Sequence, residues 1–220
     1  RGRPTRARGD ALRELPTTEV PAARRTREDL QLLAVREILR ATAAALPLEK
    51  ILTVTVNMAI IVFDATTSWL MLAEDTRLRT AVARGEYATR LVGATCEGPA
   101  TSCCRVVAAA RPEILQPQDV DPADPVIGFF ARNDEPVVLV PIMSAGRVVG
   151  LLGSAVRPEA ALDISFLVTM AEQAGGAIES ARLREETRTW RERLDAVFER
   201  MAEAVLVFDR DGRLVLMNAA

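Results

Sequence analysis

The sequence predicts an α+β protein in which helices flank a central antiparallel sheet and a long C-terminal helix leads to a short hairpin. Apolar, β-branched runs near 66–82 and 137–156 predict the two hairpins of the sheet. Segments with helical spacing of apolar residues precede, separate and follow these runs. Because 49% of the 220 residues are hydrophobic, one domain with a substantial core is expected.

Residues 1–27 predict a flexible basic tail or linker, because they carry eight arginines and three prolines with few large apolar side chains. The segment has no aromatic side chain on which a base could stack, so a solvated linker is favoured over a nucleic-acid-binding arm. The net charge of −2 is close to neutral, so the chain as a whole has no electrostatic field that would attract nucleic acid, and no nucleic-acid partner is expected.

Two helices are predicted first, over 28–46 and 48–63, with Pro47 as the interruption. A hairpin follows, with strands near 68–72 and 78–82 around a polar turn. The Ala-rich stretch 99–111 then predicts a short helix.

The second half predicts a strand at 112–115 and a hairpin with strands at 137–142 and 147–156. The apolar density of this hairpin predicts burial on both faces. Between them, 116–135 is rich in Pro and Asp and is expected to be a loop, which either covers a binding site or is a passive crossover.

The last long helix is expected near 161–200, and part of it predicts a parallel coiled coil. Six residues spaced 4, 3, 4, 3 and 4 apart form the a and d positions of the predicted seam. These seam residues are Leu183, Thr187, Trp190, Leu194, Val197 and Met201. We therefore expect a homodimer; the alternative is that this helix packs on its own domain.

The absence of histidine excludes histidine general acid–base catalysis, Ser-His triads, His-ligated zinc or haem and a histidine phosphoacceptor from this chain. Three cysteines within nine positions are a poor disulfide framework, so a reducing cytoplasm is the expected location. No apolar run approaches the roughly 20 residues that span a bilayer. The chain starts without Met and ends just after a strand-like run, so a fragment with its output domain elsewhere is expected.

Two motifs resemble the GAF domain family. Val140-Pro141-Ile142 followed by 146–152 resembles the signature "vPl…grviGvl", and 166–183 resembles the closing helix of that family. Gly146 is expected to permit the turn, and Gly150 a close backbone approach. The resemblance covers about 28–187 and implies a GAF-like sensory domain over 28–182.

Residues 193–220 resemble the start of a PAS domain, with Asp211-Gly212 as a hairpin turn between apolar strands. The expected organisation is therefore a signalling coiled-coil helix over 183–201 and a truncated PAS-like start over 202–220. This order implies signal transduction, as in sensor histidine kinases, cyclases and regulated phosphatases. The expected function is a sensory input region, sensor histidine kinase-like, that binds a small ligand or senses redox state and relays it through a dimeric helix.

The resemblance places Cys96, Cys103 and Cys104 in the variable region that covers the ligand pocket of GAF domains. Thiols there suggest oxidant sensing through a disulfide between Cys96 and one of the other two; the alternative is that they are small buried hydrophobic residues. The remaining pocket candidates are Trp69, Phe129 and Phe130 as apolar lining, with Arg90 or Arg105 as polar anchors. Aromatic residues at such positions are alternatively plain core. The ligand and any cofactor stay unknown.

Other GAF-associated chemistries are disfavoured by specific residues. Three sulfurs fall short of the four ligands of a closed metal or iron–sulfur site, so no metal is assigned. Bilin attachment pairs a Cys with a following His, whereas Cys103 precedes Cys104, which precedes Arg105. The Phe130–Glu135 stretch matches half of a cyclic-nucleotide motif, but its Asn-Lys half is missing.

No catalytic residue and no enzyme activity are assigned to this chain. Two alternative functions are kept: a dimerisation module without a sensing role, and a GAF-fold, thiol-dependent methionine sulfoxide reductase.

Overall fold

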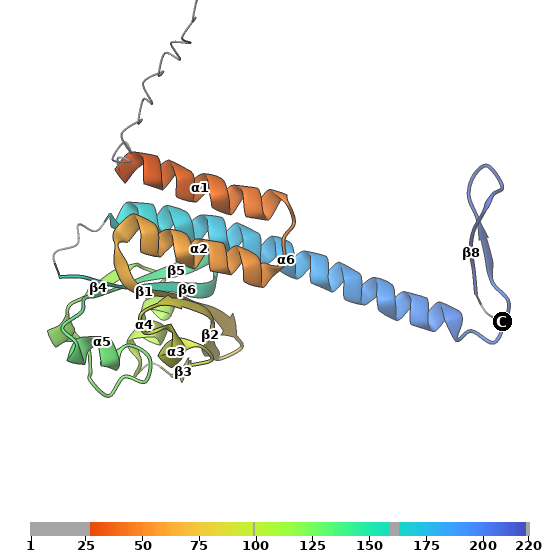
Figure 1. The fold of residues 1–220 in the computed structure, drawn as a ribbon. Coiled ribbons are helices and arrows are strands. Elements are labelled where there is room, and N and C mark those ends of the chain that lie inside the picture. The colour runs from red at the N-terminus through yellow and green to blue at the C-terminus, as the bar shows by residue number, and fades with distance from the viewer. Residues whose placement is uncertain (1–26, 99, 159–162, 219–220) are drawn as a thin grey trace, which may run out of the picture.

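The computed structural model describes residues 27–98, 100–158 and 163–218, which form a three-layered α+β domain, a projecting helix and a hairpin (Figure 1). In chain order the elements are α1 (Arg27–Ala43), α2 (Leu48–Phe63), β1 (Ala65–Glu74), β2 (Arg77–Gly85), α3 (Ala88–Leu91), β3 (Thr95–Glu97), α4 (Ser102–Ala109), β4 (Glu113–Leu115), the 3-10 helix η1 (Pro117–Asp119), α5 (Gly128–Arg132), β5 (Val137–Ser144), β6 (Arg147–Val156), α6 (Ile164–Glu199), β7 (Leu206–Phe208) and β8 (Leu214–Met217). The predicted fold class is confirmed.

A six-stranded antiparallel sheet in the order β3-β2-β1-β6-β5-β4 forms the middle layer. Both predicted hairpins are present, and their long strands β1 and β6 pair at the centre, with Leu70 opposite Leu152. The positive φ of Gly146 (78°) makes the turn between β5 and β6, as expected, because a residue without a Cβ adopts this conformation without strain. The β5–β6 hairpin is buried on both faces over most of its length, as predicted.

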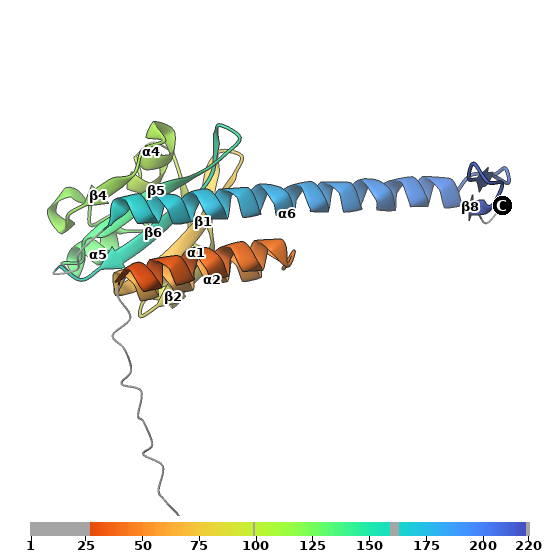
Figure 2. The ribbon, with the colours of Figure 1, turned by 90° about the horizontal axis from the view of Figure 1, so that it is seen from above.

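Side chains alternate along the strands and build a separate core on each face of the sheet. Leu70, Val140 and Leu152 face α1, α2 and the first half of α6, which lie side by side (Figures 1 and 2). Trp69 and Leu139 belong to the opposite core, under α3, α4, α5 and the loops between them.

The start of α6 is fixed by one aspartate. The Asp163 side chain accepts a hydrogen bond from the backbone N–H of Phe166 at 3.2 Å, which caps the helix. Its other carboxylate oxygen accepts from the Gln31 amide of α1 at 3.0 Å. This residue therefore ties the first helix of the domain to the last one.

Several predicted boundaries need correction. The first helix ends at Ala43, three residues before the predicted end, because Ala45 takes a positive φ of 50° ahead of Pro47. The second helix, 48–63, is confirmed in full. The helix predicted over 99–111 is the shorter α4, and the last helix ends at Glu199, two residues before Met201.

Two predictions fall on residues outside the described ranges. The tail over 1–26 and the predicted helix start at Ala161 cannot be compared with the structure, and Arg27 already belongs to α1. Short elements were missed: α3 and β3 follow the first hairpin, and the predicted loop 116–135 contains η1 and α5. Elements of three to five residues are too short to show a period in a sequence.

Beyond Ile178, α6 leaves the domain and has no buried side chain up to its end at Glu199 (Figure 1). It leads to a small antiparallel sheet formed by β7 and β8. The buried Asn218 holds this hairpin, since its amide oxygen accepts from Val205 N–H at 2.8 Å and its amide nitrogen donates to the Glu203 carbonyl at 2.8 Å. None of the described helices is both long and apolar enough to cross a membrane.

Candidate functional site

The structure brings the three predicted cysteines together as a thiol cluster, defined here as Cys96, Cys103 and Cys104. Cys96 comes from the edge strand β3, and the other two come from the first turn of α4. Cys96 and Cys103 are buried, whereas Cys104 is half-buried. The sulfur atoms of Cys104 and Cys96 lie 3.7 Å apart, and all three thiols are free.

Thr101, which the sequence reasoning missed, positions this cluster. Its hydroxyl oxygen caps α4 by accepting from the backbone N–H of Cys104 at 3.4 Å. The threonine directly before a helix is the signal that would have identified it. The side chain of Asp124 accepts from the next free N–H of this helix end, that of Ser102, at 3.0 Å.

Hydrogen bonding and burial give the three thiols different pKa values. Side-chain hydrogen bonds from Cys103, and also from Cys104 and Thr101, outweigh burial and lower the pKa of Cys96 to about 7. The hydrogen bond to Cys96 and complete burial raise the pKa of Cys103 well above its usual range. Burial is the main cause of the raised pKa of Cys104. The arrangement therefore provides one thiolate near neutral pH beside two protonated thiols.

Aromatic side chains fill the space next to the cluster. Trp69 and Phe130 are both fully buried, and their rings stack with centroids 5.3 Å apart and an angle of 5° between planes. Gly153 lies opposite Trp69 in the sheet, and any Cβ there would overlap the indole ring. The Trp69 indole N–H has no hydrogen-bond partner among the described residues. These two predicted pocket residues therefore occupy this part of the interior as core.

A hollow of about 270 Å³ lies beside this aromatic stack, with Phe130 on one side. Arg90, Phe129 and Phe130 line it together with Tyr87, which the sequence reasoning missed. The guanidinium of Arg90 lies 4.3 Å from the centre of the Phe129 ring, a cation–π contact. Arg105 is not among these lining residues; it pairs with Glu113 at 3.5 Å on the surface.

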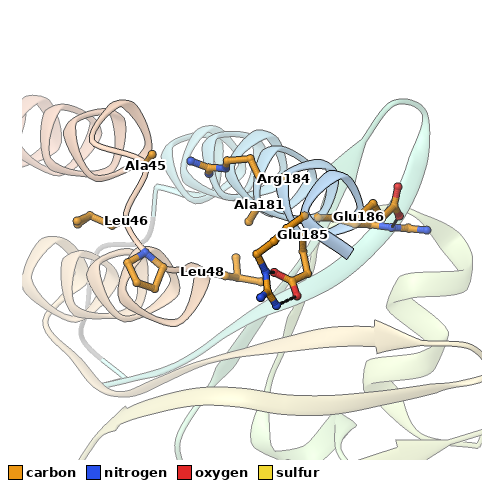
Figure 3. A pocket seen from close by; sticks show the side chains of 10 residues that line it. Ala45, Leu46, Leu48, Ala181, Arg184, Glu185 and Glu186 are labelled. Carbon is orange, nitrogen blue, oxygen red and sulfur yellow. Dashed lines mark hydrogen bonds and ion pairs between the residues drawn. The ribbon is translucent and has the colours of Figure 1, made fainter. Parts of the chain in front are cut away.

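Larger hollows flank α6 where it leaves the domain, and none of them was predicted. One, of about 580 Å³, lies between the α1–α2 turn and α6, as Figure 3 shows. Leu46, Leu48 and Ala181 are its apolar lining, and Arg184 and Glu185 lie on its α6 side. Another, of about 480 Å³, is bounded by side chains of α6 alone, among them the seam residues Leu183 and Thr187, so it is an open groove along the projecting helix.

Metal binding finds no support within residues 27–98, 100–158 and 163–218. No group of three or more potential ligand side chains is placed to hold a metal ion there.

The fold has an antiparallel sheet in the middle, a helical layer on one face and a layer of short helices and loops on the other, and its last helix continues outward. This arrangement defines a class of α+β domain. A model of the GAF domain family matches residues 35–179, which is more than half of the chain. The chain belongs to the GAF domain family. Among curated proteins, no relative matches it.

Solved structures share this fold. The GAF domain of a phosphoenolpyruvate-protein phosphotransferase from Coxiella burnetii is 20% identical, with a TM-score of 0.60 over 71% of this chain and 96% of that one. A free methionine-R-sulfoxide reductase from Neisseria meningitidis is 16% identical, with a TM-score of 0.57 over 72% and 91%. Residues 122 to 287 of a methyl-accepting chemotaxis protein are 17% identical, with a TM-score of 0.56 over 69% and 99%. At these identities the likeness establishes the fold, and proteins that share it include both signalling proteins and an enzyme.

Proposed function

We propose that this chain is the sensory input region of a signal-transduction protein and relays its signal through a dimeric α6. The observation that carries the proposal is that α6 is one unbroken helix of 36 residues, half embedded in the domain and half projecting from it. The order of GAF domain, helix and PAS-like hairpin over 202–220 favours a sensor histidine kinase-like protein whose output domain lies elsewhere. The three free thiols favour a reducing compartment such as the cytoplasm.

The projecting half of α6 needs a partner for physical reasons. Its four large apolar seam residues, Leu183, Trp190, Leu194 and Val197, are 55–65% exposed, and Met201, two residues beyond the helix end, is 43% exposed. A helix of this length without tertiary contacts is only marginally stable in water. A second copy in parallel would bury the seam residues at the a and d positions of both chains.

The relay we propose is a change in how the two α6 helices pack. A ligand or a redox change that favours one of two packings of the domain pair shifts the register or rotation of the seam. Since α6 is continuous from Ile164 to Glu199, displacement of its embedded half is carried to its projecting half.

The test is the solution mass of Leu194→Asp, with Thr189→Asp as the matched control. Thr189 is half-buried and lies about 140° around the helix from Leu194, away from the seam, so both variants add one carboxylate, but only one adds it to the seam. We expect sedimentation equilibrium to show that Leu194→Asp raises the dimer dissociation constant by roughly 100-fold or more, because a buried unpaired charge costs about 3 kcal/mol. A fully dimeric Leu194→Asp protein would refute the seam.

A methionine sulfoxide reductase is the second candidate function, and the thiol cluster is the observation that favours it. The reductase from Neisseria meningitidis has the same fold, and sulfoxide reduction requires a thiolate and a resolving thiol. Incubation with free methionine sulfoxide and a dithiol reductant decides the question: formation of methionine would support the enzyme.

The other alternative is a dimerisation module without a sensing role. Its thermal stability should depend on protein concentration alone and should not change with any ligand or oxidant.

A further inference from the structure

We propose that the thiol cluster is a redox-sensing site in which a hydroperoxide joins Cys96 and Cys104 in a reversible disulfide. The inference rests on the proposed sensory function and supplies its input. Three cysteines allow three pairs, and distance, burial and hydrogen bonding together favour the pair of Cys96 and Cys104.

Distance selects Cys96 and Cys104. Their sulfur atoms are 3.7 Å apart, and a disulfide requires about 2.05 Å, so about 1.7 Å of movement closes the bond. One thiol sits on a three-residue edge strand that pairs with β2 alone, and the other on the first turn of an eight-residue helix. Short elements at the edge of a fold accommodate a shift of this size more readily than central strands do.

Hydrogen bonding selects Cys96 as the attacking sulfur. A thiolate, rather than a thiol, is the nucleophile toward a peroxide. The Cys104 thiol donates to the Cys96 sulfur at 3.7 Å. Hydrogen bonding by Cys103, Cys104 and Thr101 lowers the pKa of Cys96 to about 7, which favours its thiolate near neutral pH. Cys103, fully buried with a raised pKa, stays protonated as a donor to that thiolate.

Exposure selects Cys104 as the resolving thiol. It is the member of the cluster with the largest exposed surface, whereas Cys96 is 3% exposed and Cys103 is fully buried. A small hydroperoxide reaches Cys96 past Cys104, and a reductant later reaches the sulfur of Cys104. Packing alone would not require such an arrangement, because buried thiols that merely fill space need no hydrogen bonds that stabilise a thiolate.

The oxidation of the two thiols takes place in two steps. The Cys96 thiolate attacks one peroxide oxygen and breaks the O–O bond, which gives a sulfenic acid and an alkoxide that takes a proton from water. The Cys104 sulfur then attacks the Cys96 sulfur, the S–S bond forms, and hydroxide leaves and takes the Cys104 proton as water. Two thiols lose two electrons in total, the peroxide gains them, and a dithiol reductant reverses the reaction.

The position of the cluster couples it to α6. The first turn of α4 carries Cys104, and the α4 residues Cys103 and Val106 pack with Leu139 of β5 in one core. Val138, Val140 and Ile142 of the same strand pack on α6 from the other face. A covalent tie between β3 and α4 therefore acts on a strand that α6 covers.

The test is mass spectrometry of the whole chain after mild hydrogen peroxide, followed by digestion at glutamate without reduction. Glu97 lies between Cys96 and the other two cysteines, so cleavage there separates the partners unless a disulfide joins them. We expect a loss of two mass units, linked peptides 87–97 and 98–113, and full reversal by a dithiol. Cys104→Ser should lose the linkage, whereas Cys103→Ser should keep it.

Three results would overturn the proposal: no mass change, a linkage that persists in Cys104→Ser, or a Cys103–Cys104 disulfide that leaves the two peptides separate. Circular dichroism of each variant checks that it is folded. The dimer dissociation constant, measured on the reduced and oxidised protein, tests the relay separately. A disulfide without any change in dimerisation would contradict the proposed relay and leave the redox chemistry intact.

Discussion

Trp69 and Phe130 determine how much room this domain has on the face of the sheet opposite α6. Both are completely buried and stacked, so the volume between β1 and α5 is taken by side chains. On this face of the sheet, a small ligand therefore binds in the hollow near Arg90 or displaces aromatic core. The thiol cluster needs no such space, because its reaction joins two atoms already 3.7 Å apart.

The Trp69–Phe130 stack depends on Gly153. We expect Gly153→Ala to lower the free energy of unfolding by about 1–3 kcal/mol, because its Cβ would overlap the indole of Trp69 and force the core to shift. Urea denaturation of the variant and the parent measures this difference. Equal stability would mean that Trp69 moves easily, and the interior would then be open to a ligand.

The reactivity of Cys96 should depend on pH in a way that ordinary thiols do not. Because its pKa is lowered to about 7, the rate of alkylation by iodoacetamide should rise as pH increases through 7 and level off above it. A free cysteine shows the same rise near pH 8.5. The rate is measured on peptide 87–97 by mass spectrometry.

The donor to Cys96 that lowers its pKa most is Cys103, which provides the control for that pH profile. Cys103→Ala removes the hydrogen bond and should move the midpoint to higher pH, whereas Cys103→Ser keeps a donor and should move it less. A midpoint that is the same in all three proteins would mean that hydrogen bonding does not set the acidity of Cys96.

At the scale of elements, α6 has two halves that face different neighbours. The embedded half buries Leu167, Met170, Ala174 and Ile178 against the sheet and the other helices. The seam residues of the projecting half start at Leu183 and do not continue that face, since five residues turn an α-helix by about 140°. One helix thus presents one face to its own domain and another, we propose, to a second copy.

Alanine substitutions at two adjacent glycines of α6 show which side of the helix has no neighbouring atoms. The backbone carbonyl of Met143 occupies the place of a Cβ at Gly175, whereas Gly176 has no atom within 4 Å of that place. Gly176→Ala should therefore raise the free energy of unfolding by about 1 kcal/mol through helix propensity, and Gly175→Ala should lower it. Urea denaturation measures both. A destabilised, dissociated Gly176→Ala protein would show that a partner helix lies close to that face.

At the scale of the whole molecule, the domain and the projecting part are held by different interactions. The domain has two cores on one sheet, while the projecting part of α6 has surface ion pairs such as Arg188 with Glu185 at 2.6 Å. Exposed ion pairs of this kind contribute little to stability. The hairpin after α6 is a two-stranded sheet whose large apolar residues, among them Phe208 and Val215, are exposed. An isolated hairpin is marginally stable, so we expect the rest of a PAS-like domain to cover it.

Hydrogen exchange should reveal this division. Amides of 167–180 should be protected at every protein concentration, because tertiary packing holds them. Amides of 187–199 should become protected only as the concentration rises and dimers form. The Leu194→Asp variant is the comparison: it should lose protection over 187–199 and keep it over 167–180. Equal protection of both halves in that variant would mean that the projecting helix is stable alone.

The sequence by itself determined the fold class and most of the long elements. Helical spacing of apolar residues identified α2 over 48–63, and apolar, β-branched runs identified the strands of both hairpins, because such patterns reflect which side chains are buried. The glycine at 146 and the proline at 47 marked turns through their own backbone preferences. The same local reasoning predicts the seam of α6 and a dimer formed through it, and both stay predictions.

Only the tertiary structure decided what the candidate site contains. Cysteines 96 and 104 lie eight positions apart on different elements, and no local rule states that their sulfurs meet. The short β3, α3 and α5 have no detectable period, so the sequence predicted a loop over 116–135 and missed α5. Likewise, the pairing of Trp69 with Gly153 depends on the register of β1 with β6, which arises only when distant segments form one sheet. Local patterns encode which residues are buried, and long-range packing determines which of them touch.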